Sequence, residues 1–244
     1  MHIPNPHRIK QLAYDILFPP LCTYCGIDLT TTMPLCADCM QMIQRQTTLR
    51  CPLCNARNAE QKRCAHSPQR MRKHPYLLGA ASYYNDPIIR TCLHRYKYEG
   101  LHALAPFFAQ LLGEYIATLR PTPAILSTTP TVVPIPLHSS KERTRGFNQS
   151  ALIARLVAQS LNFLYAEPLI KIAATSPQAQ TPTHEQRFEH IRGAFALSHH
   201  AAITGKNILL IDDVTTSGAT LSEAAQTLKA AGARTILALV VAKA

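Results

Sequence analysis

The sequence predicts an α/β protein in which a parallel sheet flanked by helices follows a small metal-binding module. Three observations support this prediction. Seven of the eight cysteines lie between Cys22 and Cys64. From residue 76 onward, strand-like apolar segments alternate with helix-like segments. Hydrophobic residues make up 47% of the chain and charged residues 16%, a balance that is typical of a folded core and excludes wholesale disorder.

We expect three parts along the 244 residues. Residues 1–19 form a short helix that stops at Pro19-Pro20, because proline cannot continue a helix. Residues 20–75 form the cysteine-rich module, and residues 76–244 form the α/β domain. The chain shows no export signal and no apolar stretch of the ~18 residues that a membrane span needs. We therefore expect a cytoplasmic protein.

Two periodicities alternate in the α/β part. Continuous apolar runs are typical of parallel strands that are buried on both faces, and apolar residues at helical spacing predict amphipathic helices. The expected strands are residues 77–84, 132–135, 206–211 and 234–241. The expected helices are residues 87–98, 101–119, 147–161 and 218–231. Proline and polar residues predict loops over 120–131 and 173–187.

Two Cys-x-x-Cys pairs, Cys22/Cys25 and Cys36/Cys39, are separated by ten residues. The tight turn of each pair aims two thiolates at one point, and four thiolates complete a tetrahedral shell for Zn²⁺. Such a shell leaves no open coordination position, which indicates a structural ion. In a chain without an export signal, clustered pairs indicate a metal rather than disulfides.

A third pair, Cys51/Cys54, lacks a complete partner, because Cys64 is followed by no second cysteine at this spacing. A second zinc could use these three thiolates and one imidazole, from His66 or His74. A cross-braced arrangement, with the first pair joined to the third, is also open. The module has few apolar residues, so we expect it to fold only with its metal.

The segment 208–221 contains an apolar strand, two carboxylates, small hydroxyl residues with a glycine, and then a helix. Ligands bind at the C-terminal ends of parallel strands, and amides at a helix N-terminus cradle phosphate. The carboxylates repel phosphate but suit ribose hydroxyls or Mg²⁺. An N-cap and turn is the simpler alternative. The predicted ribose-5-phosphate site comprises Asp212, Asp213, Thr215, Thr216, Ser217, Gly218, Ala219 and Thr220.

Basic residues exceed acidic ones by 25 to 14, which gives a net charge of +11. This excess favours nucleic acid, phosphorylated substrates or anionic surfaces as partners. His94, Arg95 and Lys97 give the helix over 87–98 a basic face, which is either solvated or in contact with pyrophosphate or nucleic acid. The tyrosines that could stack on bases, Tyr83, Tyr84, Tyr96 and Tyr98, are expected mostly to be packed.

Segment 208–221 resembles the phosphoribosyl-pyrophosphate (PRPP) motif of type I phosphoribosyltransferases, with Ser217 as its unusual position. Together with Lys97-Tyr98-Glu99-Gly100, the Val-Pro-Ile-Pro block at 133–136, Arg-Gly-Phe-Asn-Gln at 145–149 and the cysteine pairs, it resembles the ComF family over nearly the whole chain. The resemblance implies a type I phosphoribosyltransferase fold with Mg²⁺ beside PRPP. It also implies a pyrophosphate loop at Pro134, Ile135 and Pro136, with Arg143 and Arg145 as neutralising cations.

The same resemblance implies a role in handling single-stranded DNA during natural transformation, with a helicase-like partner of the DNA-uptake machinery. The phosphoribosyl group would then be a ligand or regulator. An active phosphoribosyltransferase and a zinc-stabilised adaptor for a protein partner are the two alternatives. In the polar segment, Gln178 or Gln180 and Arg187 match the family pattern, whereas His190 stands where the family has asparagine.

Overall fold

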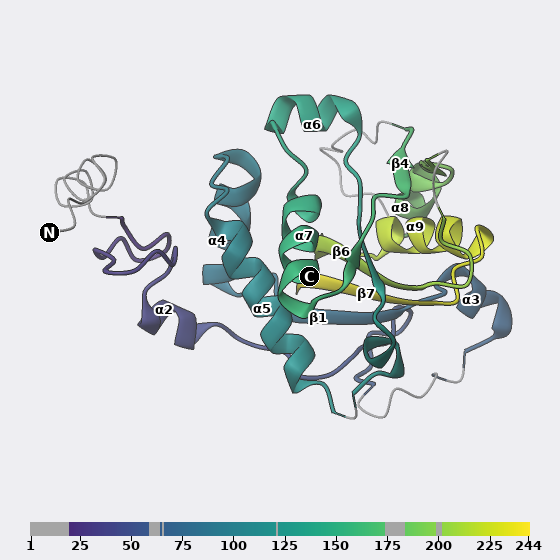
Figure 1. Ribbon diagram of the computed structural model, residues 1–244, viewed down its shortest axis with the longest axis horizontal. Coiled ribbons are helices and arrows are strands. Elements are labelled where there is room, and N and C mark those ends of the chain that lie inside the picture. Colours follow the sequence, from purple (N-terminus) through teal and green to yellow (C-terminus); the bar gives the residue numbers. More distant parts are fainter. Residues whose placement is uncertain (1–19, 59–63, 65, 121, 174–183, 199–201) are drawn as a thin grey trace, which may run out of the picture.

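The computed structural model describes residues 20–58, 64, 66–120, 122–173, 184–198 and 202–244 (Figure 1). The helix expected over residues 1–19 lies outside this part of the chain, and so do Gln178 and Gln180. None of the helices in the described part is long and apolar enough to cross a membrane.

Five parallel strands of the described residues form the main sheet, in the order β1-β7-β6-β2-β3. Their bounds are Leu77–Tyr83 for β1, Thr131–Pro134 for β2, Leu164–Tyr165 for β3, Asn207–Thr215 for β6 and Thr235–Lys243 for β7. The four predicted strands are thus confirmed, with shifted ends. Strands β6 and β7 lie in the centre, and their continuous apolar runs are buried on both faces.

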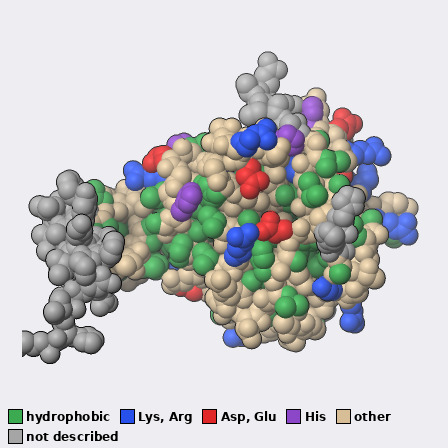
Figure 2. Space-filling model, turned by 45° about the horizontal axis from the view of Figure 1, so that its top comes forward, with side chains coloured by type: hydrophobic (Ala, Val, Ile, Leu, Met, Phe, Trp, Pro, Cys, Tyr) green, Lys and Arg blue, Asp and Glu red, His purple; other side chains and the backbone are tan. Residues whose placement is uncertain are grey.

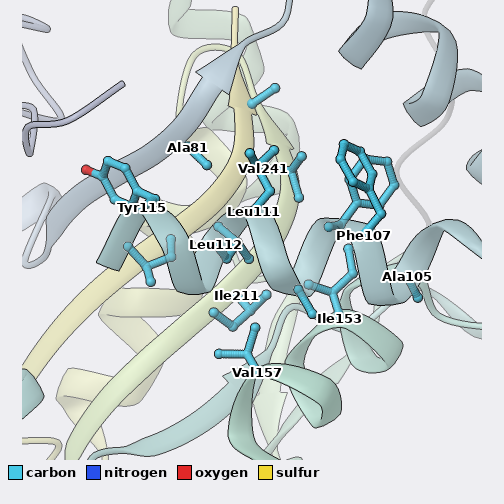
Figure 3. Packing of buried hydrophobic residues seen from close by; sticks show 14 of the residues in the cluster. Ala81, Ala105, Phe107, Leu111, Leu112, Tyr115, Ile153, Val157, Ile211 and Val241 are labelled. Carbon is cyan, nitrogen blue, oxygen red and sulfur yellow. The ribbon is translucent and has the colours of Figure 1, made fainter. Parts of the chain in front are cut away.

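Helices cover both faces of this sheet (Figure 1). On one face lie α4 (Pro87–Tyr98), α5 (Leu104–Thr118) and α7 (Gln149–Leu161), and on the other lie α8 (His184–Ile191) and α9 (Ala219–Ala230). Side chains of a strand alternate between the faces, so Leu209 and Ile211 enter the first core and Ile208 and Leu210 enter the second. Figure 3 shows α5 and α7 meeting β6 and β7 in the first core.

Several elements differ from the sequence prediction. A 3-10 helix, η1 (Ala124–Thr128), and helix α8 lie in segments that we expected to be loops. Helix α8 forms because Phe188 and Ile191, three residues apart, reach the second core on one helical face. The short strands β4 (Leu169–Lys171) and β5 (Phe195–Leu197) pair antiparallel, and α6 (Ser139–Arg145) follows the Val-Pro-Ile-Pro block. None of these was predicted.

The cysteine-rich segment contains α2 (Ala37–Met42), and α3 (Pro68–Lys73) follows it. Between them the chain runs antiparallel to β1: Gln46 N donates to Ala81 O over 2.9 Å and Arg50 N donates to Leu78 O over 2.7 Å. This backbone covers the open edge of β1, which would otherwise present unpaired amides and carbonyls. The sheet therefore takes partners from residues before position 75, where we expected the domain boundary.

Gly79 of β1 tests the packing of the first core. A Cβ at this position would lie 2.5 Å from Leu239 Cδ2 and 2.7 Å from Tyr115 Cε1. We predict that Gly79→Ala lowers the free energy of unfolding by about 1–3 kcal/mol, the usual effect of overpacking. Gly113→Ala in α5 is the control, since its Cβ meets nothing within 4 Å. It should raise stability by up to about 1 kcal/mol. Urea unfolding measures the free energy of unfolding of both variants. Equal changes in the two variants would contradict the close packing around Gly79.

Candidate functional site

The first cysteine cluster has the geometry of a tetrahedral zinc site. The sulfur atoms of Cys22, Cys25, Cys36 and Cys39 all lie within 4.8 Å of one another, and those of Cys25 and Cys36 are 3.7 Å apart. A Zn–S bond of about 2.3 Å in a tetrahedron requires sulfur atoms about 3.8 Å apart. Burial opposes ionisation of Cys22, but hydrogen bonds from backbone amides outweigh it and lower the pKa of this thiol to about 6.

The second cluster consists of Cys51, Cys54, Cys64 and His66. The sulfur atoms of Cys54 and Cys64 are 3.9 Å apart, and Cys51 Sγ lies 3.4 Å from His66 Nε2. The structure therefore selects His66 rather than His74 and pairs the cysteines in sequence order, without cross-bracing. His74 is buried elsewhere, with its Nδ1 2.7 Å from Ser222 Oγ. Both donor sets fit structural zinc.

Strand β6 extends further than the sequence prediction, which ended the strand at residue 211. It continues through both aspartates to Thr215. The two carboxylates have different partners. Ser150 Oγ, at the start of α7, donates to Asp212 over 2.8 Å. Lys97 Nζ contacts Asp213 over 2.9 Å.

The ion pair between Lys97 and Asp213 brings α4 into the site. Helix α4 starts at a buried cap, Asp86, whose Oδ1 accepts hydrogen bonds from the amides of Ile88 and Ile89. Burial opposes the charge of Lys97, but the field of Asp213 more than offsets it and raises the pKa of the lysine. Burial, and then the charge of Asp213, raise the pKa of Asp212 to about 7. Lys97 is thus a site residue, not part of a merely solvated face.

The loop between β6 and α9, together with the last residue of β6 and the first residues of α9, covers residues 215–220. The sequence predicts that it binds phosphate, and we call it the phosphate loop. Gly218 has φ 77° and precedes α9, so a residue with a side chain would be strained there. A Cβ on Gly218 would also lie 3.1 Å from the Tyr76 hydroxyl. Arg187 of α8 donates from Nη1 to Thr216 Oγ1 over 3.4 Å. The structure therefore brings this arginine to the loop, whereas His190 is exposed at the end of α8.

A cleft of about 280 Å³ opens beside the phosphate loop. One wall is the loop itself, and another is formed by residues 52–55, which include Cys54 of the third Cys-x-x-Cys pair and which the sequence placed in a separate module. The lining residues are Pro52, Leu53, Cys54, Asn55, Tyr76, Leu78, Thr215, Thr216, Ser217, Gly218 and Lys243. Sequence reasoning missed Lys243 and the 52–55 wall, since no local pattern links positions so far apart.

The predicted pyrophosphate loop lies at the end of β2, next to β6. Pro134 is the last residue of β2, and Ile135 N donates to Ile211 O over 2.9 Å. Asn148 Nδ2 in turn donates to Ile135 O over 3.1 Å. Beside this loop, Gln149 is 1% exposed, and its side-chain nitrogen has no hydrogen-bond partner among the described residues. A buried donor of this kind is suited to an acceptor on a ligand.

Three cations lie close together near this loop, and we call Lys141, Arg145 and Lys171 the cationic patch. Burial, and then the charge of Arg145, lower the pKa of Lys141. Burial, and then the charge of Lys141, lower the pKa of Lys171. Arg145 lies on α6 as the sequence suggested, and Arg143 is exposed on the same helix. Lys171 was missed because β4, which carries it, was not predicted.

Basic and acidic side chains are mixed on the surface of the protein (Figure 2). On the face that Figure 2 shows, basic side chains lie beside acidic ones in the middle of the molecule and again along its right-hand edge. The positive charge is thus spread over this face, and the acidic groups interrupt it.

Comparisons with known proteins match both parts of the chain. A family model of the phosphoribosyl transferase domain matches residues 148–244, and one of the double zinc ribbon domain matches residues 13–67. The first match contains the phosphate loop and the second contains both cysteine clusters. The chain therefore combines a double zinc ribbon with a phosphoribosyltransferase-like parallel sheet, as the sequence predicted.

Relatives match most of the length. A Salmonella typhimurium protein named DNA utilization protein YhgH is 27% identical over 224 residues, which cover 89% of this chain and 94% of that protein. Competence protein ComFC of Bacillus subtilis is 29% identical over 198 residues, which cover 80% and 77%. A solved adenine phosphoribosyltransferase aligns with a TM-score of 0.36 and 16% identity over 62% of this chain and 75% of that one. Because that TM-score is low, the fold assignment rests on the strand order and the family models.

The two cysteine clusters predict two zinc ions per chain and distinct roles for two histidines. His66→Ala should leave one zinc, since it removes a ligand of the second cluster. His74→Ala should retain two zinc ions and lower the free energy of unfolding by about 1–3 kcal/mol, because it leaves the buried Ser222 hydroxyl with fewer partners. Metal analysis by mass spectrometry and urea unfolding measure these effects. Loss of zinc from the His74 variant alone would contradict the ligand set.

Proposed function

Because the chain belongs to the ComF family, we propose that it binds a 5-phosphorylated ribosyl ligand of the PRPP type at the phosphate loop. We further propose that it handles single-stranded DNA, consistent with a role in competence. The observation that carries the ligand proposal is the convergence at one sheet edge of the loop over 215–220, both aspartates and the cationic patch.

Each part of the ligand has suitable groups at this edge. The loop before α9 offers amides and hydroxyls for the 5-phosphate, because a helix N-terminus attracts anions. Asp212, as a hydrogen-bond acceptor, suits ribose hydroxyls or Mg²⁺ bound with the ligand. The cationic patch and the side-chain nitrogen of Gln149, which has no hydrogen-bond partner among the described residues, suit the pyrophosphate. The arrangement therefore supports binding of a phosphorylated pentose more strongly than a simple helix cap.

A test of the ligand uses calorimetry with PRPP and Mg²⁺, and with ribose 5-phosphate. We predict that both bind, and that Asp212→Asn weakens PRPP binding about tenfold or more, since one good charged contact changes affinity by this order. Asp38→Asn is the matched control, because Asp38 is exposed on α2 in the cysteine-rich segment, whereas Asp212 lies in β6 next to the phosphate loop. No heat with either ligand on zinc-loaded protein would refute the proposal.

Turnover is the alternative that the paired carboxylates favour, since two carboxylates beside a phosphate loop are suited to the donor half of a phosphoribosyl transfer. Incubation of the protein with PRPP, Mg²⁺ and a panel of nucleobases distinguishes turnover from binding without turnover. Release of pyrophosphate that Asp212→Asn abolishes would establish an enzyme. PRPP binding without release would leave a ligand-binding role.

The DNA proposal depends on an exposed aromatic group within the basic region. Tyr98, at the end of α4, is 66% exposed. The Arg145 guanidinium lies 5.4 Å from its ring centre, and the His94 ring lies 5.0 Å away. Tyr96, by contrast, is fully buried and donates to Gln149 O. Exposed aromatic rings beside cations are suited to stacking on unpaired bases, so Tyr98 departs from the expectation that these tyrosines are mostly packed.

We predict that single-stranded DNA binds with an affinity that falls steeply with salt, at a slope of log K on log salt of about −0.7 per phosphate contact. Tyr98→Ala should weaken binding by about 1–3 kcal/mol through lost stacking. Tyr84→Ala is the control, since Tyr84 is also exposed, at 37%. Fluorescence anisotropy with a labelled oligonucleotide measures both. Equal effects of the two substitutions, or no binding at low salt, would contradict the proposal.

A further inference from the structure

The second zinc cluster (Cys51, Cys54, Cys64 and His66) lies beside the phosphate loop rather than in a separate module. Residues 52–55 include the ligand Cys54 and directly follow the ligand Cys51. They form one wall of the cleft, and the phosphate loop forms another. The first cluster contributes none of the residues that line this cleft. The two zinc clusters therefore have different relations to the candidate ligand site.

The 52–55 wall is held against the sheet by the backbone of its neighbours. Arg50 N donates to Leu78 O over 2.7 Å, and Cys51 N donates to Ala56 O over 2.9 Å. The Arg50 side chain donates to Asn55 O and to the Tyr83 hydroxyl, each over 3.1 Å. These bonds fix the base of the Cys51–Cys54 turn on the edge strand β1, so that its tip faces the cleft.

The other half of the cluster connects to the helix that follows the phosphate loop. The chain leads from His66 into α3, and Lys73 O at the end of α3 accepts a hydrogen bond from Gln226 of α9 over 3.0 Å. Ser222 of α9 then lies 2.7 Å from His74 Nδ1 and 3.3 Å from the Tyr76 hydroxyl. That hydroxyl is the group closest to a Cβ on Gly218.

The cluster thus joins two segments, one that forms the wall opposite the phosphate loop and one that packs against α9. Zinc bound to these ligands ties Cys51 and Cys54 to Cys64 and His66, in a segment with few apolar residues of its own. Metal ligation in such small segments supplies the energy that fixes their geometry.

We propose that the Cys51–Asn55 turn is a positioning element of the sugar-phosphate cleft, and that zinc in the second cluster sets the affinity of this cleft for phosphorylated pentoses. The proposal rests on the proposed function, because it assumes that the cleft binds such a ligand. Leu53 lines the cleft with the phosphate loop, and the ion would hold this wall at a fixed distance from the loop.

The first experiment compares loss of one ligand from each cluster. Cys64→Ser and Cys25→Ser should each reduce the zinc content from two ions to one. The affinity for ribose 5-phosphate, measured by calorimetry, should fall about tenfold or more in Cys64→Ser and change less than about twofold in Cys25→Ser. Circular dichroism checks that both variants retain the helices of the α/β domain. Equal affinities of the two variants would overturn the proposal.

A second pair of variants keeps both zinc ions and tests the wall directly. Leu53→Glu places a carboxylate opposite the phosphate loop, and Leu53→Gln is the uncharged control of the same size. We expect Leu53→Glu to weaken ribose 5-phosphate binding about tenfold relative to Leu53→Gln, because like charges repel across the cleft. If the two variants have equal affinities while the wild type binds ribose 5-phosphate, the proposed role of residues 52–55 is wrong, but the proposed ligand is not. If the wild type binds no sugar phosphate, both proposals fail.

Discussion

Burial of β6 on both faces and pairing on both of its edges fix the geometry on which the candidate site depends. Strand β7 lies on one edge and β2 on the other, and helices cover both faces. A slip of one residue in such a strand would exchange its two apolar sets between the cores. The register is therefore firmly set, and the strand must deliver Asp212, Asp213 and the loop after Thr215 to the same sheet edge.

Charge at this edge is arranged in two ways. Asp213 is neutralised within the fold by Lys97, whose position depends on the capped start of α4. In the cationic patch, by contrast, burial and then the charge of Arg145 lower the pKa of Lys141, and burial and then the charge of Lys141 lower the pKa of Lys171. Cations that repel one another are stabilised when a polyanion binds among them. This contrast separates the internal ion pair from the groups that remain for a ligand.

The zinc ribbon is more closely joined to the α/β domain than the composition of the chain suggests. Residues 45–50 cover the edge of β1, and residues 52–55 form a wall of the cleft. Hydrogen bonds through His74, Ser222 and Tyr76 extend the same connection beneath the phosphate loop. A segment too poor in apolar residues to form a core of its own is thus ordered by metal and by an open strand edge.

Much of this arrangement was predictable from local patterns. Apolar periodicity identified β1, β2, β6, β7 and the helices α4, α5, α7 and α9, because strands and helices bury side chains with periods of about 2 and 3.6 residues. The ordered residues of segment 208–221 identified the loop, and the cysteine spacing indicated one four-thiolate site and the three thiolates of a possible second one. The short strands β4 and β5 were missed because their pairing with each other defines them, and α8 was missed because only Phe188 and Ile191 mark its apolar face in a polar segment.

The sequence by itself determined the fold class, the strand-loop-helix segment over 208–221 and the presence of a zinc-binding cysteine module, since each depends on residues that are close along the chain. Only the tertiary structure decided that His66 and not His74 completes the second cluster, that Lys97 pairs with Asp213, and that the 52–55 wall faces the loop. These relations join positions far apart in sequence. They are set by strand order and helix packing, which bring distant side chains together without leaving a local signature.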